Sequence, residues 1–404
     1  MNRIRKILVI TERFYPESFL INDLVTEWSG KDVEVTVLTQ APSYPMDAIY
    51  PGYRNNLVSV QRYGRVRVFR FFTVLGYKNN VILKMLNYLS FVVCALFLGI
   101  PLGLSADAVF VYHTGPLTLA IPAACIKLIS PGKRTVIWTQ DIWPDTVFAY
   151  GFSSEGLFSH LLKSLVRFIY RGFDSIIVSS EGFVERVRQY ARKATPIHHI
   201  PQWAPPEIYE GSCSDIEMDS STFNFCFAGT IGTMQNLDML IDAFGRASSK
   251  DSYIRLHLIG DGSGRARLES RVRQNAYPGI VFHGQKPIKE VLPWLKASDA
   301  LILPLTSDPV VSLTLPAKTQ AYLVARKPIL AIARGAVENL VLRYNLGLAA
   351  SPDDENDIEG KILAMSSWVE ADGGKVQENA AYLLDNLFCK RKSVDALFKA
   401  CVDG

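Results

Sequence analysis

The second half of the sequence holds a glycine turn of a kind that binds phosphate. A β-rich run ends at Ala228, then Gly229, Thr230 and Gly232 turn the chain, and a helical pattern begins near Asn236. Glycines let backbone N–H groups come close to an anion, and a helix N-terminus adds partial positive charge. The other interpretation is an ordinary strand-to-helix turn, in which Gly is common.

Lys318 is a second candidate for binding a phosphate. It follows Pro316 and Ala317 directly ahead of a helical pattern. A lysine at a helix N-terminus adds a full charge to the helix dipole, which suits a phosphate group. The alternative is a helix that begins at Pro316 and carries a solvated lysine. Two further turns, at 260–264 and 284–287, also follow β-rich runs in this half.

In the first half, polar residues follow the ends of several β-rich runs. Glu17 and Asn22 lie beside the first strand–helix turn, where they could face a bound ligand or cap the helix. Asp141 follows the run VIWTQ, where a carboxylate could orient a hydroxyl group or cap the next turn. His113 and Glu181 follow two other runs, and His113 could equally be a hydrogen-bonded loop histidine.

Two sets of alternating strands and helices are expected to position these residues. The runs are almost continuously apolar, as in parallel sheets that helices cover on both faces. The strands predicted in the first half are Ile7–Ile10, Val33–Leu38, Ala108–Val111, Thr135–Trp138, Ser175–Val178 and His198–Ile200. Those predicted in the second half are Phe225–Ala228, Arg255–Ile259, Ile280–Phe282, Ala300–Leu303, Pro328–Ala331 and Leu346–Ala349. Ligands of doubly wound sheets bind at the carboxyl ends of the strands, so we expect a site in a cleft between two such domains.

The chain is predicted to form two domains joined by a linker. At 404 residues it is too long for one ordinary core. Residues 1–200 form the expected N-terminal domain and residues 223–404 the C-terminal domain. Residues 201–222 are rich in Pro, Ser and acidic residues and form the expected linker. The helical segment near Val376–Val402 could pack on either domain.

Composition narrows the choice of partners and compartment. The net charge of +4 is too small to predict nucleic-acid binding. The six cysteines form no CxxC pair, which argues against a zinc site and fits a reducing cytosol. The apolar stretch after the N-terminal basic residues is too short for a signal peptide. We therefore expect a cytoplasmic protein without a metal site.

A basic segment and an apolar segment adjoin in the first half. Six basic residues fall within 23 positions: Arg62, Arg65, Arg67, Arg70, Lys78 and Lys84. Asp and Glu are absent from Gln61 through Ala106. This arrangement suits an anionic membrane surface, or it is a solvated face with a buried helix behind it. Met85–Ala106 is uncharged, but its clearly apolar core, Phe91–Leu104, is 14 residues long, which favours a buried or interfacial helix over a membrane span.

Taken in order, the four turns of the second half resemble the donor domain of glycosyltransferase family 4. That family has the GT-B fold, in which two Rossmann-like doubly wound α/β domains face a cleft. The first half is similar to one branch of the family, the N-acetyl-L-fucosamine-type transferases of bacterial O-antigen, capsule and colanic acid assembly. The segments that carry this likeness are ITERFYPESFLINDLVTEW, VEVTVLTQAPSYPMDAIYPGY, VIWTQDIWPDTVFAYG, VSSEGF and IPQWAPP.

The resemblance implies how a sugar-nucleotide donor is bound. The first glycine turn would bind the diphosphate, the loop at 284–286 would lie against the nucleobase, and Lys318 would hold the phosphates. Glu338 could reach the ribose or the sugar. The positions implied for donor binding are Gly229, Thr230, Gly232, Gln235, Gly284, Gln285, Lys286, Pro316, Ala317, Gln320 and Glu338. A basic residue often follows the first turn in the family, whereas this chain has Met234–Gln235 there.

The resemblance also implies catalytic and acceptor-binding residues, with one departure. The candidate catalytic residues are Asp141, His113 and Lys318, and the candidate acceptor-binding residues are Glu17, Asn22 and Glu181. Most members of the family carry two glutamates eight positions apart near the donor sugar. Leu313 and Ala321 occupy those places here, with Asp308 nearby in sequence. Either the donor sugar is held differently, or the protein is not catalytic.

The activity implied is that of a retaining, metal-independent hexosyl or N-acetylhexosaminyl transferase. It would need no cofactor beyond its co-substrate, a UDP-linked sugar. Its acceptor would be a polyprenyl-diphosphate-linked saccharide in surface polysaccharide biosynthesis. The protein would lie peripherally on the inner face of the bacterial cytoplasmic membrane, beside other assembly enzymes. The alternatives are a non-catalytic partner subunit that binds a nucleotide sugar, and a GT-B nucleotide-sugar epimerase.

Overall fold

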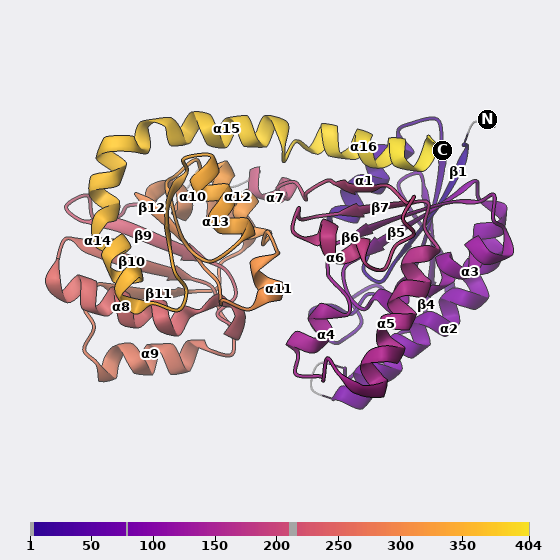
Figure 1. Ribbon diagram of the computed structural model, residues 1–404, viewed down its shortest axis with the longest axis horizontal. Helices are drawn as coiled ribbons and strands as arrows, with labels where there is room; N and C mark the ends of the chain where they lie inside the picture. Colours follow the sequence, from indigo (N-terminus) through magenta and orange to yellow (C-terminus); the bar gives the residue numbers. More distant parts are fainter. Residues whose placement is uncertain (1–3, 78–79, 210–215, 404) are drawn as a thin grey trace. The chain divides into compact units, whose positions relative to one another are not determined.

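The computed structural model describes residues 4–77, 80–209 and 216–403 and divides into two compact units (Figure 1). The N-terminal unit comprises Met1–Pro201 together with Arg391–Gly404, and the C-terminal unit comprises Gln202–Lys390. Each unit is a mainly parallel β-sheet packed between helices. The apolar strands of the sequence predict this architecture, because strands between two helical layers are buried on both faces.

An eight-stranded sheet forms the core of the N-terminal unit. Its strands lie in the order β3-β4-β2-β1-β5-β6-β7-β8, and only β3 and β4 pair antiparallel. Their bounds are β1 Lys6–Thr11, β2 Glu34–Gln40, β3 Val58–Tyr63, β4 Val66–Phe71, β5 Ala108–His113, β6 Arg134–Thr139, β7 Ser175–Val178 and β8 Ile197–His199. The six strands predicted in this half are confirmed, each to within two residues at either end.

The hairpin of β3 and β4 was not predicted, because its basic residues were interpreted as a membrane-facing or solvated segment. Arg67 on β4 instead pairs with Glu34 on the neighbouring strand β2. Arg70 is only 4% exposed, and its guanidinium donates to the backbone oxygen of Gln40. The prediction of a basic surface is therefore wrong for Arg70, because its guanidinium is buried and hydrogen-bonded inside the unit. Lys78 lies outside the described residues.

Helices cover both faces of this sheet (Figure 1). Helices α2, α3 and α5 pack in a row on one face, whereas α1 and α16 lie on the other. The helices of this unit are α1 Leu20–Ser29, α2 Val81–Ser105, η1 Leu117–Ala120, α3 Ile121–Ile129, α4 Asp145–Ala149, α5 Gly156–Arg171, α6 Phe183–Arg188 and α16 Lys390–Val402. Trp28 of α1 donates to the backbone oxygen of Val394 at 3.4 Å and packs edge-on against Phe398. The last helix therefore packs on the N-terminal unit, a choice that the sequence left open.

Helix α2 is long and apolar enough to cross a membrane, yet it packs along the sheet. Its buried residues recur every fourth position and form one stripe: Asn87, Phe91, Ala95, Gly99 and Gly103. A Cβ at Gly99 would lie 3.0 Å from Leu38 on β2, and one at Gly103 would lie 2.4 Å from Ile126 on α3. Glycine at these positions therefore lets α2 approach its neighbours closely, while the opposite side of the helix is exposed.

A six-stranded parallel sheet forms the core of the C-terminal unit, in the order β11-β10-β9-β12-β13-β14. Its strands are β9 Phe223–Ala228, β10 Ile254–Ile259, β11 Ile280–Gly284, β12 Ala300–Pro304, β13 Ile329–Ile332 and β14 Gly347–Ala350. The six predicted strands are again confirmed. Its helices are α7 Pro206–Tyr209, η2 Thr233–Gln235, α8 Leu237–Lys250, α9 Arg265–Gln274, α10 Ile288–Ala297, α11 Pro309–Ser312, α12 Lys318–Ala325, α13 Ala336–Arg343, α14 Glu355–Asp372, η3 Gly373–Lys375 and α15 Val376–Asn386. The strand order reverses between β9 and β12, and ligands of such sheets bind at the carboxyl ends beside a reversal.

The predicted linker at 201–222 is wrong at its start. Trp203, Ala204 and Ile208 are buried, and Ala204 and Ile208 belong to the apolar core of the C-terminal unit. Helix α7 packs against α10 and α12 of the same unit. Proline and acidic residues indicate irregular backbone, but they do not show that the apolar residues among them pack into the core of the C-terminal unit. The segment from residue 391 onward belongs to the N-terminal unit, which is one of the two packings that the sequence left open.

We expect the stability of the C-terminal unit to depend on pH because two of its histidines are paired. His257 Nδ1 lies 3.0 Å from His283 Nε2, and His257 Nε2 lies 3.0 Å from Asn224 Oδ1. Burial lowers the pKa of His257 to about 4. Unfolded histidine titrates near pH 6.5, so the unfolded chain binds more protons between these values and stability falls as the pH drops through them. We expect a loss of about 1 kcal/mol, because solvent screens the partly exposed ring.

Urea unfolding at pH 7 and pH 5 checks this prediction. His257→Gln should remove much of the pH dependence. His160→Gln, which changes an exposed histidine on α5, should keep it. An unchanged pH dependence in His257→Gln would contradict the prediction.

Candidate functional site

Loops at the carboxyl ends of β9 and β10 interlock through glycines. Gly229 N–H donates to the backbone oxygen of Ile259 at 2.9 Å. A Cβ at Gly260 would lie 1.8 Å from the oxygen of Gly229, and one at Gly262 would lie 2.3 Å from the oxygen of Ile231. Gly260 also has a φ of +145°, which only glycine adopts readily. The run at 260–264 therefore holds the first glycine turn in place.

The first glycine turn keeps backbone donors available for a ligand. The N–H groups of Thr230 and Gly232 make no hydrogen bond to any residue that the structure describes, whereas Ile231 N–H donates to Asp261. Thr230 is exposed and Gly232 half-buried. Helix α8 begins five residues later, at Leu237. An anion at this turn therefore meets two unused donors near a helix start.

Lys318 places its ammonium group against the same turn. It is the first residue of α12, and its Nζ donates to Gln235 Oε1. Nζ lies 4.4 Å from the ring centre of Phe227 and 3.0 Å from the position that a Cβ at Gly229 would take. Burial lowers the pKa of Lys318 to about 7. Its charge is therefore partly lost at neutral pH without a ligand, and a nearby phosphate would favour the charged form.

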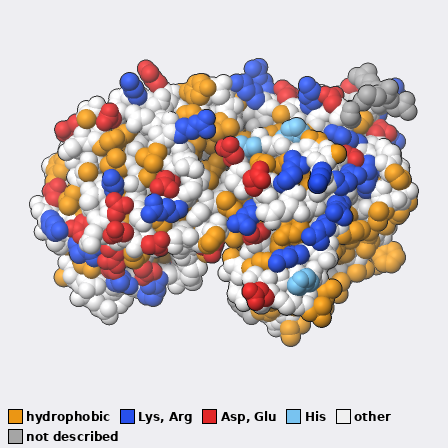
Figure 2. Space-filling model, viewed as in Figure 1, with side chains coloured by type: hydrophobic (Ala, Val, Ile, Leu, Met, Phe, Trp, Pro, Cys, Tyr) orange, Lys and Arg blue, Asp and Glu red, His pale blue; other side chains and the backbone are white. Residues whose placement is uncertain are grey.

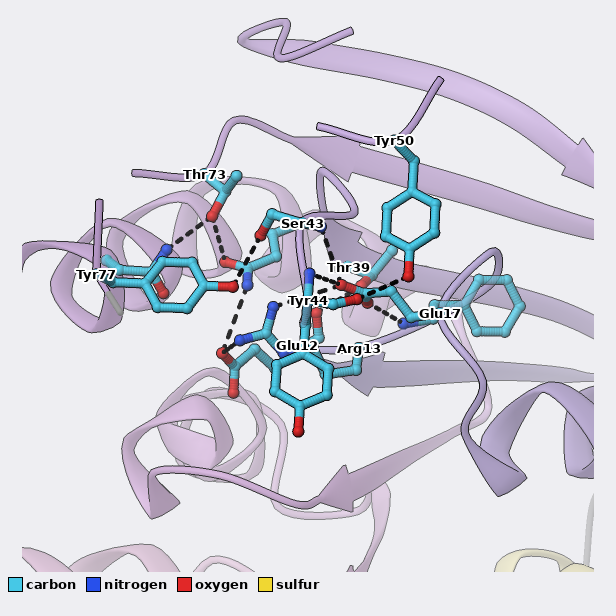
Figure 3. Close-up of polar contacts among 12 residues, drawn as sticks. Glu12, Arg13, Glu17, Thr39, Ser43, Tyr44, Tyr50, Thr73 and Tyr77 are labelled. Atoms are coloured by element: carbon cyan, nitrogen blue, oxygen red, sulfur yellow. Dashed lines mark hydrogen bonds and ion pairs between the residues drawn. The ribbon is translucent and has the colours of Figure 1, made fainter. Parts of the chain in front are cut away.

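A buried group of charged residues lies where β1 ends in the N-terminal unit (Figure 3). Arg13 Nη2 lies 2.8 Å from Glu12 Oε1, and Arg13 Nη1 lies 3.5 Å from Glu17 Oε1. None of the three side chains is more than 10% exposed. The guanidinium carbon of Arg13 lies 5.0 Å from the ring centre of Tyr44 and 5.6 Å from that of Tyr77. Two carboxylates thus share one enclosed cation.

Glu17 uses its carboxylate to hold two loops together. The carboxylate accepts the N–H groups of Phe14 at 3.2 Å, Ser43 at 3.0 Å and Tyr44 at 2.7 Å (Figure 3). Burial raises the pKa of Glu17, and the Arg13 cation and these three donors oppose the rise. The carboxylate therefore already has partners inside the unit, and a contact between Glu17 and an acceptor stays a prediction.

Asn22 also fixes the turn after β1. Its Nδ2 donates to the backbone oxygen of Glu17 at 2.7 Å, and its Oδ1 accepts the N–H of Tyr15 at 2.9 Å. The N-cap of α1 is Phe19, which makes no side-chain cap, so neither Asn22 nor Glu17 caps that helix. A contact between Asn22 and a ligand stays a prediction, although the side chain is already hydrogen-bonded inside the unit. Glu181 is exposed after β7 and stays a prediction.

His113 is fully buried at the end of β5. Its Nε2 lies 2.7 Å from the backbone oxygen of Gly115, and its Nδ1 contacts Thr139 Oγ1. A carbonyl oxygen only accepts, so Nε2 carries the proton. Burial lowers the pKa of His113 to about 4, against the opposing field of Asp141, and the ring is neutral at neutral pH. Both ring nitrogens are occupied, which matches the predicted alternative of a hydrogen-bonded loop histidine.

Asp141 follows β6, the strand beside β5. Its Oδ1 accepts the N–H of Ile142 at 2.8 Å and the hydroxyl of Thr146 at 2.5 Å. This is the capping role that the sequence left open beside the catalytic one. The side chain is half-buried. A contact between its second oxygen, Oδ2, and a ligand stays a prediction.

The comparison with protein families bears on the C-terminal unit. Residues 222–367 match the family described as glycosyl transferases group 1. This stretch contains all six strands of the sheet, the glycine turn and Lys318. The similarity to group 1 glycosyl transferases thus lies within the C-terminal unit.

Two curated glycosyltransferases are similar to parts of this chain. An uncharacterized glycosyltransferase of Methanocaldococcus jannaschii is 28% identical over 159 residues, which are 39% of this chain and 42% of that protein. A protein of Escherichia coli, described as a candidate colanic acid biosynthesis glycosyl transferase, WcaI, is 22% identical over 297 residues, or 69% of this chain and 71% of that protein. The matched region thus spans less than half of the archaeal protein.

Solved structures show that the whole chain has the GT-B fold. Sucrose-phosphate synthase from Thermosynechococcus elongatus superposes with a TM-score of 0.70 at 13% identity, covering 98% of both chains. HepE of Anabaena, solved in complex with UDP and glucose, superposes with a TM-score of 0.65 at 14% identity, also covering 98% of both chains. The two Rossmann-like units that the sequence predicts are therefore confirmed.

Two residues predicted to bind the donor have other roles in the C-terminal unit. Glu338 Oε2 accepts the N–H of Gly335 at 3.2 Å and so caps α13, and its Oε1 lies 3.3 Å from Arg334. Gln320 is 1% exposed, and its Nε2 donates to the backbone oxygen of Gln202 at 3.2 Å. Gln320 thus lies inside the unit and Glu338 caps a helix, and the contacts of both with a donor stay predictions.

The other residues predicted to bind the donor include several in loops beside β11 and α12. Gly284 ends β11, Gln285 is exposed and Lys286 is half-buried ahead of α10. Pro316 and Ala317 precede the first residue of α12. Their contacts with a nucleotide stay predictions.

The two positions where the family carries glutamates hold half-buried apolar residues. Leu313 is the C-cap of α11, and Ala321 packs against the core of the C-terminal unit. Asp308 caps α11 through the N–H groups of Val310 at 2.7 Å and Val311 at 3.2 Å, so its Oδ1 is occupied. The phosphate-binding features are therefore present, whereas these two carboxylates are not.

Arg13 and Glu12 are not among the site residues predicted from the sequence, although both lie in the buried charged group. A Cβ at Gly115 would lie 2.5 Å from Glu12 Oε2, so this carboxylate reaches the loop after β5. Gln40 on β2 donates to Glu12 Oε1 at 3.4 Å. The signal was the run TERFYPE, in which one arginine stands between two glutamates directly after an apolar strand.

Proposed function

We propose that the chain is a retaining glycosyltransferase that moves a sugar from a UDP-sugar to a polyprenyl-diphosphate-linked saccharide. The sugar would be an N-acetylated amino or deoxy sugar, and the product part of a bacterial surface polysaccharide. The observation that carries the proposal is the ammonium group of Lys318 over the glycine turn of a C-terminal unit that is similar to group 1 glycosyl transferases. The colanic acid description of the Escherichia coli relative and the UDP and glucose bound to HepE support the donor and the pathway class.

The residues at the turn would stabilise the leaving group. As the bond to the sugar breaks, negative charge develops on the nucleotide diphosphate. Protonated Lys318 and the free N–H groups of Thr230 and Gly232 would meet that charge. Fixed donors that are aimed at developing charge usually make the largest contribution to catalysis. The acceptor hydroxyl would attack from the same face, and Asp141, His113 and Glu181 are the candidates to orient it.

We propose that transfer proceeds without a metal ion. Among the described residues, no group of three His, Cys, Asp or Glu side chains is arranged to bind one. Lys318 offers a positive charge at the diphosphate in its place. We also propose that the protein works in the cytoplasm, on the inner face of the cytoplasmic membrane and beside other assembly enzymes.

A UDP-release assay tests the proposal. Candidate UDP-sugars and GDP-sugars are first screened by thermal shift, since a ligand of the folded state raises the melting temperature. Donors that bind are then incubated with a polyprenyl-diphosphate-linked saccharide, and UDP and the extended lipid are measured. We expect acceptor-dependent UDP release without added metal and in the presence of a chelator.

A second candidate function is a partner subunit that binds a nucleotide sugar without transferring it. The apolar side chains of Leu313 and Ala321 favour it, because a carboxylate near the donor sugar is missing at both positions. Nucleotide binding without turnover on any donor and acceptor pair would support this candidate over the transferase.

A further inference from the structure

The outer surface of helices α2, α3 and α5 exposes large apolar side chains. Figure 2 shows such side chains gathered beside a row of basic ones on this part of the molecule. Nine of them are more than half exposed: Val81, Ile82, Met85, Leu89, Phe97, Leu128, Ile129, Leu157 and Leu161. A helix that covers a sheet normally turns polar residues outward, so an apolar surface spread over three helices indicates a contact with something apolar.

The charges of these three helices all have the same sign. Together they carry five cations, Lys84, Lys127, Lys163, Arg167 and Arg171, and no carboxylate. A surface that is both apolar and basic complements an anionic bilayer, where lipid phosphates lie at the edge of the hydrocarbon. A protein partner would have to combine an apolar patch with acidic residues.

A cavity of about 540 Å³ opens between α3 and α5 on this surface. Lys127 and Arg192 line it, and both pair with Asp174, at 2.7 Å and 3.4 Å. Arg167 and Arg171 also line it, and neither forms an ion pair with any residue in the described ranges. Two guanidinium groups one helical turn apart are therefore available to an anion, and guanidinium binds phosphate in a bidentate manner.

The walls of the cavity suggest where that phosphate comes from. Leu128 and Phe168 line it and are 67% and 38% exposed. A soluble phosphate compound gains nothing from such walls, whereas a phospholipid places its glycerol and upper acyl chains against them. Helix α2 lies along the sheet beside α3, so its apolar side can rest in the interface without crossing the membrane.

We propose that the cavity between α3 and α5 binds the phosphate of an anionic phospholipid through Arg167 and Arg171, while the apolar surface of α2, α3 and α5 enters the bilayer interface. The inference rests on the membrane location in the proposed function, but not on sugar transfer. It assigns this surface a ligand of its own, distinct from the nucleotide and the acceptor.

Vesicle co-sedimentation of the full chain tests the inference. We expect tighter binding to vesicles of phosphatidylcholine mixed with phosphatidylglycerol than to phosphatidylcholine alone. Each cation near an anionic surface contributes about 1 kcal/mol, or about fivefold in the partition coefficient, so any pair on this surface accounts for about 25-fold. The matched control is Lys84→Ala/Lys163→Ala, which removes two charges from α2 and α5 outside the cavity. Because direct contacts with phosphate add to the attraction, Arg167→Ala/Arg171→Ala should lose about tenfold more vesicle affinity than this control.

Three outcomes would overturn the inference. Equal losses of vesicle affinity in the two double variants would show that only diffuse attraction by the charged surface is involved. Equal binding of the wild type to both kinds of vesicle would show that the anionic lipid is not the ligand. Displacement of the wild type from vesicles by soluble glycerol phosphate would make a free phosphate compound the ligand. UDP binding, followed by thermal shift, should stay unchanged in Arg167→Ala/Arg171→Ala, so failure here is separable from failure of the proposed transferase.

Discussion

Lys318→Ala should weaken UDP binding by roughly 10- to 150-fold, because a hydrogen bond to a charged group contributes about 1.5–3 kcal/mol. The ammonium of Lys318 lies over the glycine turn, 3.0 Å from where a Cβ of Gly229 would be. Calorimetric titration of the full chain with UDP measures the change. Lys296→Ala is the matched control, since this lysine is exposed near the end of α10. An affinity of Lys318→Ala for UDP equal to that of the wild type would show that Lys318 does not bind the nucleotide.

The same lysine should make UDP binding depend on pH. Burial lowers the pKa of Lys318 to about 7, and a bound diphosphate favours its charged form. Above pH 7 binding must therefore take up a proton, and the affinity should fall by up to about tenfold per pH unit. Lys318→Arg keeps its charge at every pH, so its affinity should stay nearly constant between pH 7 and 9. The same pH dependence in both proteins would contradict the role of Lys318.

Arg13→Met should destabilise the N-terminal unit by about 3–5 kcal/mol, because it leaves two buried carboxylates without their cation. Glu12 and Glu17 lie 2.8 Å and 3.5 Å from the guanidinium, with side chains 6% and 2% exposed. Urea unfolding of the full chain, followed by circular dichroism, measures the loss. Arg5→Met, which changes an exposed arginine just before β1, should cost little.

A second substitution separates lost charge pairing from lost packing. Arg13→Met/Glu17→Gln removes one unpaired carboxylate and should recover part of the stability. The deficit of Arg13→Met should also shrink from pH 8 to pH 5. Burial already raises the pKa of Glu17, and without Arg13 it would rise further, so falling pH neutralises the carboxylate in the variant first. A deficit that is independent of pH would show that packing alone was lost.

The strands and the glycine turn could be predicted because their signals are local. A strand buried on both faces must be apolar at nearly every position, and all twelve predicted strands are present. The hairpin of β3 and β4 escaped because Arg70 breaks that pattern and is buried through contacts with β2. Gly260 could be identified as a turn residue, but its 1.8 Å approach to Gly229 depends on two loops that meet only in the folded unit.

The roles of the polar side chains were decided by partners that are distant in sequence. Lys318 lies 83 residues from Gln235, and Glu17 lies 26 and 27 residues from the two loop N–H groups that it binds. A carboxylate or an amide looks the same in the sequence whether its oxygens face a ligand or a backbone N–H group. The residue types therefore predicted where polar groups would gather, at the carboxyl ends of the strands. Only the folded chain shows that Lys318 lies over the glycine turn, that Glu17 is hydrogen-bonded within its own unit and that Gln320 is buried within its own.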